Sequence, residues 1–214
     1  NQEGTIIGSE FNRYSVRANL DAQLKPWLKL GMSTTFTTTN DDLKKADGNE
    51  GIITYSLTTI PDMPIYDVFG NYYAEVREGY TNPNPVALAN MNQYTLERRK
   101  LTGNIFAEVS FLKNLVWHAE LGYDISGSNA ETWEPSVNLG GWQKPANSDH
   151  WQSNNNKFWQ LKNYLTYTGN IGKHHFTAML GQECWESTWK FQGITGKNLP
   201  RNDVQNPSLS EKAD

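Results

Sequence analysis

Apolar and polar residues alternate without a break over residues 13–24. One phase is apolar (Tyr14, Val16, Ala18, Leu20, Ala22, Leu24) and the other is polar (Arg13, Ser15, Arg17, Asn19, Asp21, Gln23). Because successive side chains of a strand point to opposite faces, this stretch predicts a long β-strand with one apolar and one charged face. Pro26 ends the strand, since proline lacks the N–H that a ladder needs. Alternation resumes over residues 28–36, and two strands joined by so short a turn predict a β-hairpin.

The same pattern recurs twice further along the chain. Strands over residues 101–111 and 115–125 flank a tight turn at Lys113 and Asn114. Strands over residues 159–167 and 176–184 flank a turn over residues 169–173. The sequence therefore predicts an all-β chain, an antiparallel up-and-down meander of about six long strands.

The connections between the hairpins are long, in contrast to the turns within them. They cover roughly residues 40–96 and 133–156, and a third long segment begins near Gly196. Short turns alternating with long loops are typical of outer-membrane barrels, whose short turns are periplasmic and whose long loops are extracellular. Strands of this length also exceed the usual ~5–6 residues of soluble sheets. Periodicity alone leaves a soluble sandwich open, because the polar face could meet either solvent or a wet lumen.

Composition narrows the function classes. Hydrophobic residues make up 37% of the chain, and the mean hydropathy of −0.68 is low for a membrane protein built of helices. A net charge of −4 without a basic stripe argues against nucleic acid as a partner. Cys184 is the one cysteine, and its place in the apolar phase favours a packed thiol over a nucleophile. The start at Asn1 and the polar end predict that both termini are cuts through a larger protein.

Aromatic residues form 12% of the chain and supply the candidate substrate contacts. The segment 133–159 combines tryptophans with amide side chains, and the segment 71–80 is rich in tyrosine. Aromatic faces stack on sugar rings while amides bond hydroxyl groups, so both segments suit a glycan; self-packing of the loops or contact with a lid protein are the alternatives. The residues selected as substrate-binding in extracellular loops are Trp133, Trp142, Trp151, Asn147, Tyr72 and Tyr73.

Catalytic and metal sites find little support in the sequence. His174 and His175 are adjacent, so they point to opposite faces of a strand and cannot share a metal ion there. The fragment 47–50 lacks the spacing of a calcium loop and is expected to be a surface turn. Glu131 and Glu134 would form a glycosidase pair only if their spatial separation were right, which sequence does not give. No enzyme activity, no cofactor and no metal site is predicted.

Five segments, in order, resemble SusC/RagA-type TonB-linked outer-membrane proteins. They are RYSVRANLDAQLKPWLKLGMSTTF (13–36), IPDMPIYDVFGNYY (60–73), NPVALAN (84–90), RKLTGNIFAEVSFLKNLVWHAELGYD (99–124) and NYLTYTGNIGKHHFTAMLGQE (163–183). The resemblance implies that residues 1–214 are part of a TonB-dependent receptor β-barrel domain in the outer membrane of a Gram-negative bacterium, without the plug domain and the remaining strands.

What the resemblance implies about function is import of bulky nutrients, mostly oligosaccharides and sometimes peptides. The implied partners are a SusD-like surface lipoprotein as lid, TonB acting through the missing plug, the glycan or peptide ligand, and outer-membrane lipid. Two other functions stay open: a soluble all-β carbohydrate-binding or glycosidase module, and a passive porin. Six strands cannot close so large a barrel, so the sheet is expected to be open with two edges.

Overall fold

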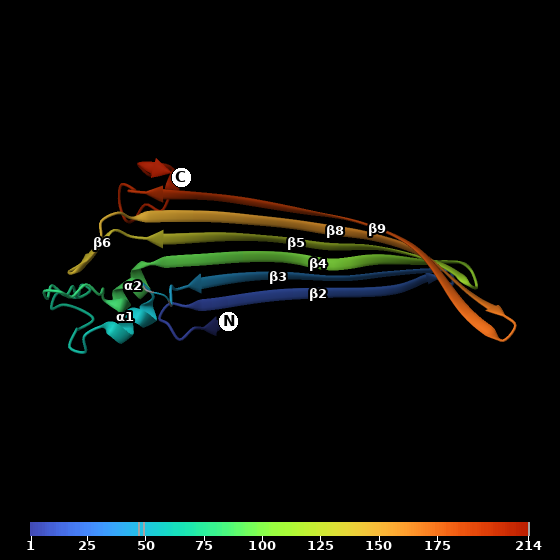
Figure 1. Ribbon diagram of the computed structural model, residues 1–214, viewed down its shortest axis with the longest axis horizontal. Coiled ribbons are helices and arrows are strands. Elements are labelled where there is room, and N and C mark those ends of the chain that lie inside the picture. The colour runs from blue at the N-terminus through green and yellow to red at the C-terminus, as the bar shows by residue number, and fades with distance from the viewer. Residues whose placement is uncertain (47, 49, 214) are drawn as a thin grey trace.

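The computed structural model, which describes residues 1–46, 48 and 50–213, is one very long sheet with a cap of loops at one end (Figure 1). The six long strands are β2 (Glu10–Lys25), β3 (Leu28–Leu43), β4 (Gln93–Leu112), β5 (Leu115–Glu134), β8 (Ser148–Ile171) and β9 (His174–Lys197). Each pairs antiparallel with the next, so the predicted all-β meander of about six long strands is confirmed.

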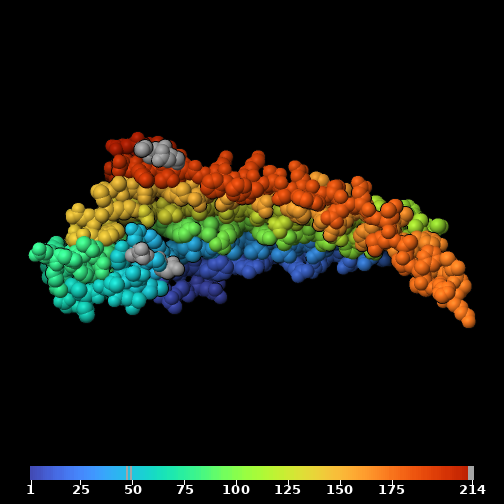
Figure 2. Space-filling model, viewed as in Figure 1, coloured from blue at the N-terminus to red at the C-terminus, as the bar shows by residue number. Residues whose placement is uncertain are grey.

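The described sheet is open. The two-residue strands β1 (Gln2–Glu3) and β10 (Lys212–Ala213) pair with short stretches of β2 and β9, and most of both outer edges carries no neighbouring strand within the described residues. In the space-filling view the strands follow one another in order from β2 to β9, and the tip of the β8–β9 hairpin projects beyond the others (Figure 2). A sheet with bare edges needs further strands to satisfy its backbone groups.

The three short turns lie at one end of the sheet, as predicted. Two residues separate β2 from β3, β4 from β5 and β8 from β9. The last of these turns contains Gly172 with φ of +61°, a left-handed conformation that glycine adopts at little cost. All of the long connections emerge at the opposite end (Figure 1).

The long connections are shorter than the sequence predicted, because the strands continue into them. The segment between β5 and β8 covers only residues 135–147, and it contains a small hairpin of β6 (Val137–Leu139) and β7 (Trp142–Lys144). The segment between β3 and β4 covers residues 44–92. Past the predicted strand ends, polar residues occupy both faces, so the apolar alternation disappears while backbone pairing goes on.

The long strands give the sheet an apolar face and a polar face. Residues paired across strands share a face. One row of the apolar face reads Leu20, Met32, Ile105, Leu121, Leu161, Cys184. The neighbouring row of the polar face reads Asp21, Gly31, Phe106, Glu120, Lys162, Glu183.

The apolar face is uncovered even in the middle of the sheet. Ile105 and Leu121 are 47% and 41% exposed there, whereas His118 on the polar face is only 7% exposed. The apolar stretch occupies the half of each strand nearer the short turns; on β4 it gives way to Arg99 and Glu97 toward the cap. An apolar surface of this extent requires an apolar surrounding or a partner.

The packed core lies in the cap. There α1 (Ile52–Thr58) packs against α2 (Pro85–Met91), and the Asn84 side chain caps α2 by accepting hydrogen bonds from the backbone N–H groups of Val86 and Ala87. The short helix η1 (Pro207–Leu209) covers the ends of β8 and β9. The buried apolar side chains of the described residues lie in the cap or at the adjoining strand ends: Tyr55, Ala87, Leu88, Ala89, Trp133, Leu139 and Leu199.

Two details complete the comparison with the sequence. Within the connection 44–92, the stretch 51–60 contains the helix α1, and the proline-containing stretch 82–85 leads directly into α2. Asp47 and Asn49, in the predicted surface turn, lie outside the described residues. Among the described helices, none has the length and apolarity needed to cross a membrane.

Candidate functional site

The polar face carries a stack of rings in the half nearer the short turns. The imidazole of His118 lies between Phe106 and Tyr164, with ring centroids 5.3 Å and 4.6 Å away, and the Nζ of Lys29 lies 5.3 Å from the centre of the Phe106 ring. Gly31 makes room for this stack, because a Cβ there would lie 2.1 Å from Phe106. The rings therefore form a layer across β4, β5 and β8, with Lys29 of β3 beside it.

Two carboxylates flank the buried imidazole of this stack. The Nδ1 of His118 is 3.2 Å from Oε1 of Glu108, and its Nε2 is 3.5 Å from Oε2 of Glu120. The stack is thus held by both ring packing and electrostatic contacts.

Charges on the middle of the polar face are paired. The Nζ of Lys100 is 2.8 Å from the carboxylate of Asp124, and Arg98 is 3.0 Å from the nearly buried carboxylate of Asp41. In these two pairs the positive and negative charges on the middle of β3, β4 and β5 cancel. Partly exposed pairs of this kind add little stability, so their consequence is a surface with little net charge.

Sequence reasoning missed a group of aromatic residues on the polar face of β8 and β9. Trp185, Trp189 and Phe191 are 62%, 67% and 50% exposed. The Trp185 ring lies 6.3 Å from Phe158 of β8, and the rings of Trp189 and Phe191 are stacked at 6.1 Å. Extending the alternation of β9 past Cys184 would have found them, because that extension assigns all three to the polar phase.

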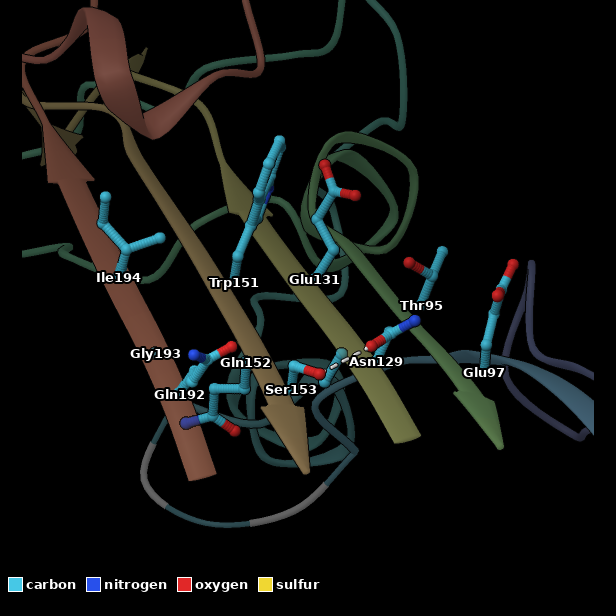
Figure 3. Close-up of a pocket in the computed structure, with 11 residues that line it drawn as sticks. Thr95, Glu97, Asn129, Glu131, Trp151, Gln152, Ser153, Gln192, Gly193 and Ile194 are labelled. Carbon is cyan, nitrogen blue, oxygen red and sulfur yellow. Dashed lines mark hydrogen bonds between the residues drawn. The ribbon is translucent and has the colours of Figure 1, made fainter. Parts of the chain in front are cut away.

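Two of the predicted substrate-binding residues, Trp133 and Trp151, lie on strands rather than in a loop. Trp133 ends β5 and is 3% exposed, while Trp151 belongs to β8. Trp151 pairs with Glu131, and both side chains point into a hollow of 530 Å³ on the continuation of the apolar face beyond its apolar part (Figure 3). Most of the residues around the hollow are polar, although apolar atoms form more of its surface, and Asn129 accepts a hydrogen bond from Ser153.

Asp149 is buried next to this hollow. It pairs with Trp133 across the strands and is fully shielded from solvent. Burial first, and then the negative charge of Glu131, raises the pKa of Asp149 to about 6. The lack of exposure makes this carboxyl a structural group at the cap end of β8, because substrate could not reach it.

Asn147 ties the C-terminal segment to the cap. It is 4% exposed; its side-chain oxygen accepts a hydrogen bond of 2.6 Å from the backbone N–H of Leu199, and its amide donates to the Leu199 carbonyl at 3.2 Å. Trp142 lies on β7 and lines a different hollow, of 240 Å³, together with Tyr55 of α1. The hydrogen bonds of Asn147 are thus used within the protein.

Tyr72 and Tyr73 lie in the cap between α1 and α2. The Tyr72 ring stacks on Tyr66 at 5.4 Å, and the backbone N–H of Tyr73 donates to the carbonyl of Ile65. The six predicted residues therefore lie in separate places. Trp151 lines the 530 Å³ hollow, and Trp133 is buried at the end of β5. Trp142 and Asn147 lie in and after the β6–β7 hairpin, and Tyr72 and Tyr73 lie in the loop that follows α1. Among the described residues, no three His, Cys, Asp or Glu side chains are grouped as metal ligands.

Comparison with known proteins gives relatives of one kind. The chain is 28% identical over 187 residues to the TonB-dependent receptor P26 of Formosa agariphila, a match that covers 85% of this chain. It is 23% identical to the TonB-dependent receptor P3 of the same organism over 84% of this chain. The chain spans 18% of the length of each relative. No protein-family model matches the chain.

Solved structures agree with this relationship at the level of the fold. The chain superimposes on the RagAB peptide transporter with a TM-score of 0.75 over 95% of its length at 21% identity. For the open-open state of the RagAB peptide importer the TM-score is 0.76 at 22% identity. The chain resembles TonB-dependent receptors in sequence and the RagAB transporter in fold, in agreement with the resemblance to the SusC/RagA type. It matches 23% of the length of those solved chains, as part of an all-β barrel wall.

Proposed function

We propose that this chain forms barrel wall and extracellular loops of an outer-membrane TonB-dependent importer for oligosaccharides or similar bulky nutrients. Residues 1–214 would then be one part of the β-barrel domain, with the plug and the remaining strands elsewhere in the protein. The relatives are receptors and the structural neighbours are transporters, which supports this class of function.

The observation that carries the proposal is the uncovered apolar face backed by a polar one. The apolar phase of β3 runs from Leu28 to Phe36, which at about 3.4 Å per residue is roughly 27 Å of strand, close to the ~25 Å belt of outer-membrane barrels. Trp27, Phe111 and Tyr167 lie near the short turns, where an interfacial aromatic girdle is expected. Lipid would contact this face, and the polar face would line the lumen.

The proposed partners follow from the same placement. The chain resembles the RagAB peptide transporter in fold. By analogy, a SusD-like surface lipoprotein would contact the cap, TonB would act through the plug, and a glycan or peptide would pass the polar face. The cap at the long-loop end is where an extracellular lid could bind (Figure 1).

The alternatives fit the structure less well. A soluble carbohydrate-binding or glycosidase module would have to cover Ile105, Leu121 and their row, and no second layer packs on that face in the described chain. A passive porin would share the two-faced wall, but the relatives are TonB-dependent receptors. We propose that the chain has no enzyme activity and uses no cofactor.

The test compares uptake in the bacterium that carries the parent gene. Strains lacking the receptor gene, or lacking TonB, are supplied with fluorescently labelled oligosaccharides, and accumulation in the periplasm is measured. The proposal expects that both deletions abolish uptake. Uptake that needs the receptor gene but persists without TonB would indicate a porin, and recovery of the protein in the aqueous fraction after membrane extraction would indicate a soluble module.

A further inference from the structure

Each exposed aromatic residue of β9 on the polar face has an amide or an aromatic partner on β8. Trp185 pairs with Gln160, Trp189 with Asn156 and Phe191 with Asn154, while Phe158 pairs with Ser187 between them. We call these seven residues the aromatic–amide strip: Phe158, Trp185, Trp189, Phe191, Gln160, Asn156 and Asn154. Paired positions have Cβ atoms about 5 Å apart, so every amide lies beside a ring.

The rings of the strip belong to the polar face of the wall. Alternation directs Trp185 and Trp189 to the same face as the buried His118, whereas their exposed fractions reflect the open edge of the described sheet, where β9 is exposed on both faces. Tryptophans on a polar face are unusual, because a ring of that size gains most by leaving water. Six residues separate Trp185 from Phe191, so the rings extend over roughly 20 Å of strand.

The amides of the strip are available for contact. Within the described residues, the side chains of Asn154 and Asn156 make no hydrogen bond to the protein, whereas Gln160 donates to Glu183. A free carboxamide offers two donors and an acceptor, which matches the hydroxyl groups of a sugar. Rings that can stack and amides that can exchange hydrogen bonds thus alternate along one surface.

Charge indicates what kind of ligand the strip fits. From Asn154 to Gln160 on β8, and from Trp185 to Phe191 on β9, the polar face carries no charged side chain. The nearest charges are Lys162 and Glu183, a directly paired row at the short-turn end of the strip, and Asp124 of β5, which pairs across the strands with Phe158. Asp124 is already paired with Lys100 at 2.8 Å, and Glu183 accepts a hydrogen bond from Gln160. The strip therefore fits a neutral ligand better than a charged one, which would lose its hydration without gaining a free partner of opposite charge.

The strip also lies at the right depth for a substrate site. On β9 the apolar face is occupied by Phe176, Ala178 and Leu180, and it becomes polar with Glu186 and Thr188. The rings of Trp189 and Phe191 are therefore nearer the cap than the apolar part of the wall. A ligand entering from the loop end would meet the strip before it reached the stack around His118.

We propose that the aromatic–amide strip binds a neutral oligosaccharide, with its sugar rings stacked on Trp185 and Trp189 and its hydroxyl groups bonded to Asn154 and Asn156. This assignment rests on the proposed import function and adds the residues and the ligand class. It differs from the sequence-based selection, none of whose six residues belongs to the strip.

The test uses the full-length receptor, purified in detergent, and a panel of neutral oligosaccharides: maltoheptaose, cellohexaose, xylohexaose and laminarihexaose, with a neutral alanine peptide for comparison. Titration calorimetry of the wild type is expected to detect binding of at least one sugar. Trp189→Ala should weaken that binding about tenfold or more, and Trp189→Phe should restore most of it, because a stacking surface remains. Trp117→Ala, which removes a tryptophan from the apolar face of β5, is the matched control and should change affinity less than about twofold.

Three results would overturn the assignment: no binding of any sugar of the panel, sugar binding that is unchanged in both Trp185→Ala and Trp189→Ala, or binding of the alanine peptide alone. If sugar binding is unchanged in both variants, the strip would instead pack against the plug. Retention of heat-modifiable migration in gels shows that each variant is folded. Uptake in cells separates the two proposals: import that needs TonB but not Trp189 refutes the strip and leaves the importer intact.

Discussion

A single arginine placed on either face of β4 should distinguish the two faces of the wall. Ile105 lies in the middle of the apolar phase, 47% exposed, in a row made entirely of apolar side chains and Cys184. Asn104, its neighbour in sequence, lies at nearly the same depth on the polar face, beside a hollow that also contains Glu120 and Asp124. Ile105→Arg and Asn104→Arg therefore introduce the same side chain into opposite surroundings.

The expected difference follows from the depth of the two positions. Arginine on the lipid face of a barrel costs about 2–4 kcal/mol at the midplane and about 0–1 kcal/mol near the interfaces. Ile105→Arg should thus shift the folding equilibrium by roughly 30- to 1,000-fold, since about 1.4 kcal/mol corresponds to a factor of ten. Asn104→Arg should cost little, because the hollow has room and two carboxylates to receive the guanidinium. The natural Arg99, six residues nearer the cap on the apolar face, marks where the cost should vanish.

The assay is denaturant unfolding of the full-length receptor in lipid vesicles, followed by heat-modifiable gel migration. Ile105→Arg is expected to lower the midpoint or the assembled fraction, and Asn104→Arg is expected to match the wild type. Equal loss in both variants would contradict the assignment of the faces. Loss in Asn104→Arg alone would mean that the assignment is reversed, with lipid against the polar residues.

Three further predictions concern particular contacts. Gly31→Ala should destabilise by about 1–3 kcal/mol, because its Cβ would lie 2.1 Å from an aromatic ring, whereas Gly122→Ala, whose nearest contact would be 3.9 Å, should be neutral in the same unfolding assay. Asn147→Ala should speed hydrogen exchange around Leu199 by one to two orders of magnitude, because loss of its buried hydrogen bonds costs about 1–3 kcal/mol. Mass spectrometry would measure the exchange, and the exchange rate of β4 should stay unchanged. Burial raises the pKa of Asp149 from 3.8 to about 6, so ionisation of this carboxyl destabilises the folded cap as pH rises from about 4 to 6. At pH 7 the cost is about 3 kcal/mol. Asp149→Asn should therefore remove the pH dependence of hydrogen exchange in the cap.

Much of the wall could be predicted because the residues of a barrel strand alternate between two different surroundings, and the sequence alternates with them. From Arg13 to Leu24 every second residue meets the same surroundings, so period-two alternation gives both the strand and its faces. The turn at Lys113 and Asn114 and the order of the strands followed from the same signal. Beyond Ile125 the strand passes out of the apolar region, both faces become polar, and the pattern that defined it ends before the strand does.

The candidate site was harder to predict for a related reason. Composition singled out Trp133, Trp142 and Asn147 because they lie close together in sequence, but exposure and hydrogen bonding depend on the cap that folds over them. Asn147 has the residue type of a sugar ligand, yet its amide is used by Leu199. Trp189 could have been assigned to the polar face by alternation alone, and the strand register of the structure shows that it lies beside Asn156.

The two halves of each strand are stabilised in different ways, and this difference determines which substitutions the protein tolerates. Near the short turns the wall is one layer thick, so Leu121 has no packing partner above it and its contribution depends on the medium that covers it. At the cap, Trp133, Leu88 and Leu199 are buried by protein, as in a soluble domain, and substitutions there create cavities. The aromatic–amide strip lies between these regions, where neither lipid nor the cap core constrains the side chains. Selection on that stretch of β8 and β9 would therefore act through the ligand, and related receptors for different nutrients should differ most at its rings and amides while keeping the apolar phase behind them.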